Sequence, residues 1–418
     1  MSDDGHKGNR RFTFKGRHVL LAAAVLLVGA IVLYIVIHRG DIERRLAALR
    51  AAGYPTTFAE LAEYTKLPEG AENAAELYTR AFAAFVAPVD EVNVPLLGQA
   101  QWPDRGATLL EPMAKAVSEC LASNQQCLLR LREAAALADC RYGWDFWPGI
   151  PEAHVQTMRR CGQLLSLGAV HHMQRGDTDA ATVCIKEGLR LSDSMRREPA
   201  LIGYLIRIAL INTALGGLER SLSLGAFTDS QLNEIDAALV RTGGTLDFTM
   251  VLATERCFMI ETCRDPSLLG PAGQTAPVRL PPGMRGTWMT DILDLMEDHI
   301  AASRLPPRER LKRFRQADDR VQQLSVLHVM IKMMAPGMSR VAEHDVRVRA
   351  RLDLARTALA LERYRLAAGR TPAQLPELVP QYLERVPLDP FDEQPIRYRR
   401  TDPGYLLYSV DADGQDHG

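Results

Sequence analysis

The chain has 418 residues, of which 47% are hydrophobic and 24% are charged, and its 50 basic and 51 acidic side chains give a formal net charge of −1. This composition excludes an intrinsically disordered chain. The balanced charge gives no overall attraction to nucleic acid, so we expect no nucleic-acid partner. The length predicts two or three folding units rather than one compact helical core.

The first predicted element is an apolar stretch from Val19 to Ile37 that contains no charged residue. Its 19 residues would extend roughly 28 Å as a helix, which is close to the thickness of the hydrocarbon core of a bilayer. Residues 19–37 therefore predict a single transmembrane helix whose partner is the lipid bilayer. A cleaved signal peptide is the alternative, but its apolar region would be shorter and would be followed by a small-residue cleavage site.

Basic residues flank this stretch unequally. Residues 1–18 form a basic tail with five Lys or Arg side chains, whereas residues 38–50 hold four. The small excess favours a cytoplasmic tail, and it places the C-terminal bulk outside the cytoplasm on a bacterial inner membrane, facing the periplasm. The opposite orientation, with a cytoplasmic body, remains an alternative.

Seven cysteines occur without a CxxC pair, a spacing that argues against a zinc site. In an oxidising compartment the candidate disulfides are Cys140 with Cys161 and Cys257 with Cys263. The alternative is that all seven are small buried hydrophobic residues. The remaining cysteines are Cys120, Cys127 and Cys184.

Apolar residues spaced by three and four predict a helical domain over residues 41–338. The sequences TFAE at Thr57 and TDSQ at Thr228 match capping boxes that open helices. Two loops rich in proline and glycine are expected at 87–108 and 265–287. The predicted helices cover 41–52, 57–64, 71–86, 109–136, 152–174, 178–195, 199–223, 229–241, 246–264, 288–303, 307–334 and 339–368.

Residues 164–191 form the most regular segment of this domain. Gly168 and Ala169 would allow two helices to approach closely, Gly176 and Asp177 would form the turn, and Ala181 would follow on the next helix. The segment resembles a tetratricopeptide hairpin. The resemblance implies that irregular helical hairpins stack and bury one another's apolar faces.

The segment DCRYGWDFWPGIPEAH, residues 139–154, combines aromatic and charged side chains. Three interpretations remain: aromatic residues that plug the helical core, a groove for a ligand or peptide, or an active site. An extracytoplasmic, hydrolase-like enzyme would use this loop with His171 or His172 as a base. The candidate ligand-binding or partner-binding residues are Arg141, Tyr142, Trp144, Asp145 and Trp147.

No catalytic residue is assigned, because the chain beyond the apolar stretch contains no HExxH, GxSxG, Walker or GxGxxG motif. Adjacent residues such as His171 and His172 diverge by about 100° on a helix and do not face one metal ion easily. Residues 304–315 carry six basic groups and one acid. They fit a solvated helix face, with contact to an anionic lipid as the alternative.

The pattern changes over residues 339–418. Tyr364, Gly369 and Pro372 lie at a predicted helix end, the turn Val386–Pro390 follows, and two short β-prone runs come after it, at PIRY and YLLYSV. The chain then reads Leu-Tyr-Ser before Ala412–Asp413–Gly414. This segment resembles the C-terminal part of the major pseudopilin of type II secretion systems.

The resemblance implies a small α+β module, residues 339–418, in which a short sheet lies on the last long helix. We expect its core to contain Tyr364, Leu366, Leu375, Leu378, Tyr382 and Leu383. The N-terminus departs from the family pattern, since Arg11 stands at the cleavage-site glycine and Gly16 at the conserved glutamate. This difference argues against prepilin processing and fibre assembly.

Pseudopilins of this family hold a calcium ion in the closing loop. The resemblance therefore implies calcium as a cofactor, bound by Ser409, Asp411, Asp413 and Asp416. The alternative is a solvated polar terminus without metal. No other cofactor is expected from the sequence.

These observations predict a mainly α protein with one transmembrane helix, an irregular array of helical hairpins and a pseudopilin-like module. The expected function is that of a membrane-anchored, extracytoplasmic scaffold or interaction protein of the bacterial envelope, with an unidentified protein partner and a link to secretion machinery. The loop-based enzyme is the alternative.

Overall fold

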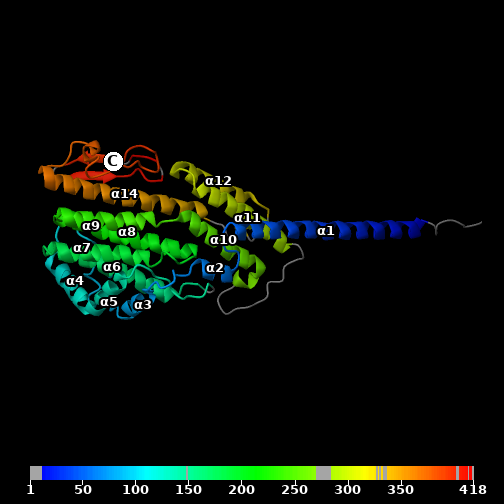
Figure 1. The fold of residues 1–418 in the computed structure, drawn as a ribbon, viewed down its shortest axis with the longest axis horizontal. Coiled ribbons are helices and arrows are strands. Elements are labelled where there is room, and N and C mark those ends of the chain that lie inside the picture. The colour runs from blue at the N-terminus through cyan, green and yellow to red at the C-terminus, as the bar shows by residue number, and fades with distance from the viewer. Residues whose placement is uncertain are drawn as a thin grey trace, which may run out of the picture.

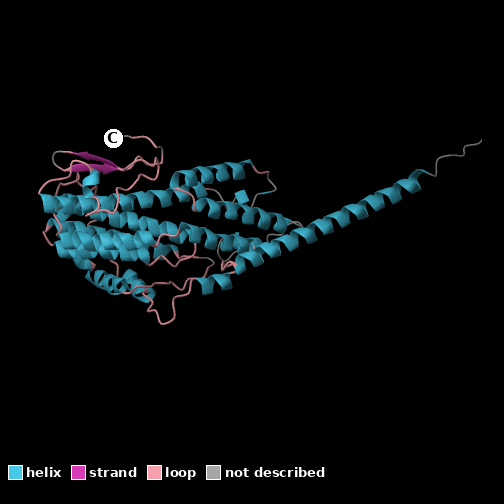
Figure 2. Cartoon of the chain, turned by 45° about the horizontal axis from the view of Figure 1, so that its top comes forward, coloured by secondary structure: helices cyan, strands magenta, loops and turns pink. Residues whose placement is uncertain are grey.

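A computed structural model describes residues 12–146, 149–269, 284–325, 328, 331–332, 337–401, 404–412 and 414–416. The described chain is mainly helical and carries one two-stranded antiparallel sheet (Figures 1 and 2), which confirms the fold class at this level.

The N-terminal element is one long helix, α1 (Phe12–Ala51), most of which projects away from the body (Figure 1). Its last turns join the body, because Ile42 and Leu46 are buried in the main core. Its neighbour there is α11 (Met284–Ser303). Arg45 forms ion pairs with Asp294 at 2.7 Å and Glu297 at 3.2 Å on that helix. The end of α1 is therefore fixed to the body by apolar and ionic contacts.

Four shorter helices follow, and the last three of them share a second core with buried side chains of residues 158–167 and 191–210. They are α2 (Phe58–Tyr64), α3 (Ala75–Ala83), α4 (Glu111–Ser123) and α5 (Gln125–Ala136). The single helix expected over 109–136 is wrong, since it is interrupted at Asn124. The side-chain amide of Asn124 donates to the carbonyl of Val86 at 2.8 Å and accepts from its N–H at 2.9 Å. The Asn124 side chain thus satisfies the backbone hydrogen-bonding groups of Val86, which gives the break between the two helices a structural role.

Three helices make the centre of the body: α6 (Glu152–Gln174), α7 (Thr178–Asp193) and α8 (Leu201–Leu224). Gly176 turns the chain between α6 and α7 with φ of +79°, and Asp177 caps α7 by accepting from the N–H of Ala180. A Cβ atom on Gly188 would lie 3.3 Å from the Cβ of Ala214 on α8. Absence of a side chain at this position therefore lets α7 and α8 approach closely.

Leaving aside α1, whose residues 20 and 27–38 are largely not described at the side-chain level, α8 is the helix among the described residues whose length and apolar composition would allow it to cross a membrane. In the body, 61% of its apolar window is buried. The helix contacts α6, α7 and α14, and these contacts account for its apolar character.

The next helices are α9 (Asp229–Gly244), α10 (Phe248–Arg264), the 3-10 turn η1 (Pro266–Leu269) and α12 (Pro307–Gln323). The capping box at Thr228 and Gln231 is confirmed. At Thr57 only half of the box forms, because the Glu60 carboxylate accepts from the N–H of Thr56 instead. The helix expected over 307–334 ends at Gln323, where Leu324 adopts an extended conformation.

The C-terminal module starts from α14 (Met338–Ala368), which ends at Gly369 with φ of +68°. A 3-10 turn, η3 (Leu375–Leu378), and the antiparallel strands β1 (Arg397–Arg400) and β2 (Tyr405–Tyr408) follow. Of the expected core residues, Leu366 is wrong, because its side chain is 44% exposed. It lies five positions after buried Leu361, which is about 140° around the helix.

The other five expected core residues of this module are buried or partly buried around Leu361 and Ile396. Among the cysteines, all seven are buried and none is bridged. Neither candidate disulfide is present. The two thiols that lie close are Cys127 and Cys161, whose Sγ atoms are 3.7 Å apart.

Candidate functional site

Residues 139–154, which we call the aromatic loop, run from just after the end of α5 into the first turn of α6. Asn73, just before α3, fixes its beginning: the Asn73 side chain donates to the carbonyl of Arg141 at 2.9 Å and accepts from its N–H at 3.0 Å. The loop therefore enters the body in one defined position, with its backbone groups satisfied by a side chain.

A buried ion pair holds the loop to the turn between α7 and α8. One guanidinium nitrogen of Arg141 lies 3.0 and 2.9 Å from the two carboxylate oxygens of Glu198, and the backbone N–H of Tyr142 donates to the same carboxylate at 2.9 Å. The Glu198 side chain is 4% exposed. Loss of hydration raises the pKa of Glu198 to about 7, against the opposing effect of Arg141.

The aromatic residues of the loop form a cluster with the adjoining core. Tyr142 is buried, donates to the Ser194 hydroxyl at 3.1 Å, and stacks on Trp144 with 4.3 Å between ring centroids. His154 meets both rings edge-on, at 5.1 and 4.8 Å. Burial lowers the pKa of His154. Phe146 packs against Phe258 on the other side of the loop.

The remaining two candidates of the loop are placed differently. Asp145 is exposed to solvent, and Trp147 lies outside the described residues. The structure thus brings Arg141, Tyr142 and Trp144 together, and their contacts are those of a loop anchored in the core.

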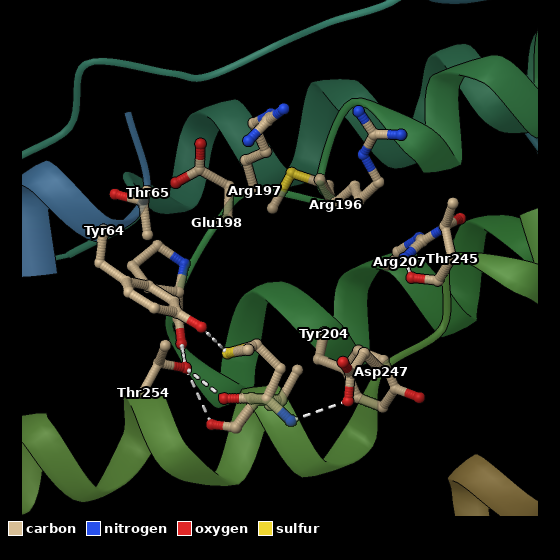
Figure 3. Close-up of a pocket in the computed structure, with 14 residues that line it drawn as sticks. Tyr64, Thr65, Arg196, Arg197, Glu198, Tyr204, Arg207, Thr245, Asp247 and Thr254 are labelled. Carbon is tan, nitrogen blue, oxygen red and sulfur yellow. Dashed lines mark hydrogen bonds between the residues drawn. The ribbon is translucent and has the colours of Figure 1, made fainter. Parts of the chain in front are cut away.

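A polar pocket of about 310 Å³ lies beside this loop, between the end of α2, the turn before α8 and the start of α10. Figure 3 shows its labelled side chains on opposite walls, with Glu198, Arg196 and Arg197 on one and Tyr204, Asp247 and Thr254 on the other. A pocket lined by several ionisable groups is a candidate for a catalytic or binding site. Five lining side chains of this pocket carry such groups: Arg196, Arg197, Glu198, Arg207 and Asp247.

The charged groups of this pocket are largely bound to other parts of the chain. Arg196 and Arg197 both donate to the carboxylate of Asp139, at 2.8 and 3.0 Å. Arg207, which is 2% exposed, donates to Asp193 at 3.0 Å and to the carbonyl of Thr245 at 2.8 Å, and its Nε has no partner among the described residues. A polar ligand would have to displace these internal partners.

Behind the wall formed by Tyr204 lies a buried carboxylate that the sequence analysis missed. Asp345 on α14 is fully buried and accepts from the hydroxyl of Tyr204 and from Arg310 at 2.7 Å and Arg349 at 3.1 Å. The spacing of Asp345 and Arg349 by four residues is the feature of the sequence that could have predicted an ion pair here. The contact of Asp345 with Arg310 joins α12 to α14, and no local sequence pattern predicts it.

His171 and His172 lie at the other end of α6 from the aromatic loop. Nineteen residues separate His171 from Glu152, which is about 28 Å along a helix. Burial lowers the pKa of both histidines, and His172 lies 3.6 Å from Asp177. The loop and these histidines therefore cannot share one catalytic site.

The acidic C-terminal residues that the structure describes face arginines. Asp411 pairs with Arg347 at 2.9 Å, and Asp416 accepts from the hydroxyl of Tyr408 at 2.8 Å. The hydroxyl of Ser409 accepts from the backbone N–H of Asp411 at 3.3 Å. Asp413 lies outside the described residues. Across the described ranges, no group of three His, Cys, Asp or Glu side chains is arranged to hold a metal, and calcium binding stays a prediction.

A different carboxylate closes this module. Asp389, in the turn that resembles the pseudopilin motif, is fully buried. Its oxygens accept from the backbone N–H groups of Phe391 at 3.0 Å and Val410 at 2.8 Å. Asp389 therefore ties the closing segment to the turn through its two carboxylate oxygens.

Comparison of the chain with protein-family models, with curated proteins and with solved structures finds no match.

Proposed function

We propose that this protein is a single-pass, membrane-anchored interaction protein of the bacterial envelope, with its helical body outside the cytoplasm. The observation that carries the proposal is the continuity of α1, which runs from Phe12 to Ala51 and contains the uncharged residues 19–37. The large apolar side chains of this stretch that the structure describes are exposed, at 65–74%: Val19, Leu21, Val25 and Leu26. Exposed apolar side chains on a helix of this length favour insertion in a bilayer.

The pairing of the charged side chains around the polar pocket with other parts of the described chain supports an interaction role over the enzyme alternative. The Arg141 and Glu198 side chains, which would be the reactive groups of a loop-based site, are bound to each other. The histidines proposed as bases lie at the far end of α6. No observation specifically favours hydrolysis.

The link to secretion machinery rests on the C-terminal module. A helix that ends at a glycine, a buried Asp389 in the following turn and a two-stranded sheet on the helix fit the resemblance to a pseudopilin. A shared fold is a weak argument for shared function. We therefore propose the secretion link as the narrower part of this role.

The orientation of the chain tests the proposal directly. A reporter enzyme that is active only outside the cytoplasm would be fused after Gly418, with a fluorescent protein that folds only in the cytoplasm as the matched control. We expect the first fusion to be active, the second to be dark, and the chain to stay in the membrane after carbonate extraction. An inactive outer reporter with a bright inner one would overturn the extracytoplasmic assignment.

The intact mass of the purified chain separates an anchor from a cleaved signal peptide. Retention of residues 1–37 is expected, and their loss would refute the anchor. Replacing Leu26 with Arg should weaken insertion, because an arginine at the centre of a membrane helix costs about 2.5–3.5 kcal/mol on insertion scales. Arg39→Leu, which removes a charge outside the span, is the control and should leave insertion intact.

A further inference from the structure

A second cavity, of about 550 Å³, lies beside α14 and is separate from the polar pocket. Its walls are α8, α14, the loop at Arg105 and Gly106, and β2. We call it the α14 groove. Its volume is within the range of about 300–1,000 Å³ that is usual for ligand sites.

The floor of the α14 groove is apolar. Leu215, Leu218 and Leu222 of α8 face Leu354 and Ala358 of α14 across it. The leucine side chains repeat at three and four residues, so they share one face of α8. This floor suits aliphatic side chains of an occupant.

One wall of the α14 groove is the free edge of the sheet. Four consecutive residues of the β2 hairpin arm, from Gly404 to Leu407, line it. Because side chains alternate between the two faces of a strand, consecutive lining residues indicate that the edge of the strand faces the cavity. The sheet has two strands, so no further strand pairs with this edge of β2 within the described chain.

The register of the hairpin shows which main-chain groups this edge presents. Thr401 donates to the carbonyl of Gly404 at 3.0 Å, and Arg399 is opposite Leu406. Hydrogen-bonded pairs alternate along an antiparallel ladder, so the N–H and C=O groups of Tyr405 and Leu407 point away from β1. Within the described ranges no main-chain hydrogen bond outside the ladder involves these two residues. The edge can therefore accept another strand.

Arg351 lies at the rim and forms no ion pair within the described residues. Its guanidinium donates to the side-chain oxygen of Asn212 at 3.0 Å, and the carboxylate of Glu219, which also lines the groove, acts on its charge from beyond ion-pair distance. Loss of hydration lowers the pKa of Arg351. By contrast, Arg105 on the same rim is paired with Glu219 at 2.6 Å. A carboxylate on a molecule bound in the groove could form an ion pair with Arg351.

We propose that the α14 groove binds an extended segment of a partner protein, which adds a third strand to the free edge of β2. Alternate aliphatic side chains of the segment lie on the leucine floor, and an Asp or Glu side chain or a terminal carboxylate pairs with Arg351. This inference rests on the proposed interaction role, and it assigns the α14 groove as the surface that binds the partner. A fatty acid could use the floor and Arg351, but it has no amide groups for the strand edge.

The test uses the full-length chain in detergent micelles and a set of fluorescein-labelled octapeptides. In these peptides Val or Leu alternates with Thr, and Asp stands at either end. The matched control peptides carry N-methyl groups on alternate amides, which removes strand pairing and keeps the side chains. Laurate is the competing probe for a lipid-like occupant.

We expect at least one peptide to bind with a Kd in the micromolar range and to slow hydrogen exchange in the segment 404–408. N-methylation should weaken binding at least tenfold. Ala358→Trp, which fills the groove, should abolish it, and Arg351→Gln should weaken the Asp-bearing peptides about tenfold. Unchanged thermal unfolding of each variant would show that it is folded.

Two results would overturn the proposal. One is that no peptide of the set changes exchange at 404–408 in the unmodified protein. The other is that laurate binds while N-methylated and unmethylated peptides behave alike. Both measurements are made on purified protein, so they leave the membrane orientation to be decided by the reporter fusions, and a failed fusion would leave the binding result unchanged.

Discussion

The polar pocket beside the aromatic loop and the α14 groove differ in how their polar groups are satisfied. In the polar pocket, Glu198 and Arg207 are held by partners in the same chain. In the α14 groove, Arg351 donates to the amide of Asn212 and forms no ion pair within the described residues, and no main-chain hydrogen bond to the outer edge of β2 is found among them. The charged groups of the region rich in charged and aromatic residues are thus paired within the chain, whereas the groove lined by leucines and alanines is where we propose that a partner binds.

This difference teaches that unusual composition is a poor guide to a binding surface. Burying a charge is costly unless it is paired, so a loop inserted among helices needs the arginines and carboxylates that made residues 139–154 conspicuous. An open groove needs only an apolar floor and a strand edge. Four predictions test the contrast between a closed region and an open one.

The largest effect is expected at the carboxylate behind the polar pocket. Asp345→Ala would leave Arg310 and Arg349 without their shared partner, and loss of one partner from a buried pair costs about 3–5 kcal/mol of unfolding free energy. Urea unfolding of the purified chain measures this change. Asp411→Ala is the control. The side chains of Asp411 and its partner Arg347 are 55% and 33% exposed, so their ion pair should contribute less than about 1 kcal/mol to the unfolding free energy. Equal effects of the two substitutions would contradict the contrast.

The second prediction concerns pH. Glu198 loses its proton near pH 4.5 in the unfolded chain and near pH 7 in the folded protein. Between these values the folded state binds more protons, so the unfolding free energy should fall as the pH rises, by about 3 kcal/mol in all. Unfolding curves at pH 5 and pH 8 measure this change.

Glu198→Gln is the matched variant for this prediction. It keeps the size of the side chain and removes its titration. We expect the difference in stability between pH 5 and pH 8 to shrink by the same amount in the variant. An unchanged difference would show that Glu198 is ionised throughout this range.

The third prediction concerns α8, which has one face in the central packing and another in the α14 groove. Gly188→Val should cost about 1–3 kcal/mol, because a Cβ at this position already lies 3.3 Å from Ala214. Gly216→Ala meets no atom within 4 Å, and it should stabilise the helix by about 0.5–1 kcal/mol. Thermal unfolding measures both, and a neutral Gly188→Val would mean that the two helices can separate.

The smallest effect is expected in the α14 groove itself. Arg351→Gln should change the unfolding free energy by less than about 0.5 kcal/mol without peptide, because this guanidinium donates to a neutral amide and forms no ion pair with a buried carboxylate of the described residues. Arg310→Gln, whose partner Asp345 is fully buried, is the comparison and should be clearly destabilising. A large loss of stability in Arg351→Gln would place this arginine in the closed part of the molecule.

Local signals in the sequence were sufficient where short-range physics decides the structure. The helix expected over 152–174 matches α6, because a proline precedes it and Gly176 follows it. The antiparallel hairpin after Pro390 likewise follows from two β-prone runs and a turn. The break at Asn124 was not predicted, since its cause is a contact with Val86, 38 residues away.

The candidate sites depend on contacts that no local pattern contains. Arg141 and Glu198 are 57 residues apart, and the α14 groove needs α8, α14 and β2 to meet. The sequence singled out Arg141 for its unusual surroundings, but it could not show that its charge is neutralised by Glu198. Nor could it show that Arg351 donates to the side chain of Asn212.

The way α1 enters the body also has a mechanical consequence. Its 40 residues make a rod about 60 Å long, and its end is held in the body by Ile42, Leu46 and the ion pairs of Arg45. With residues 19–37 in a bilayer, the rod would act as a rigid stalk rather than a loose tether. The body, and the α14 groove with it, would stand at a fixed height and tilt above the lipid surface, so a partner would have to present its segment at that height.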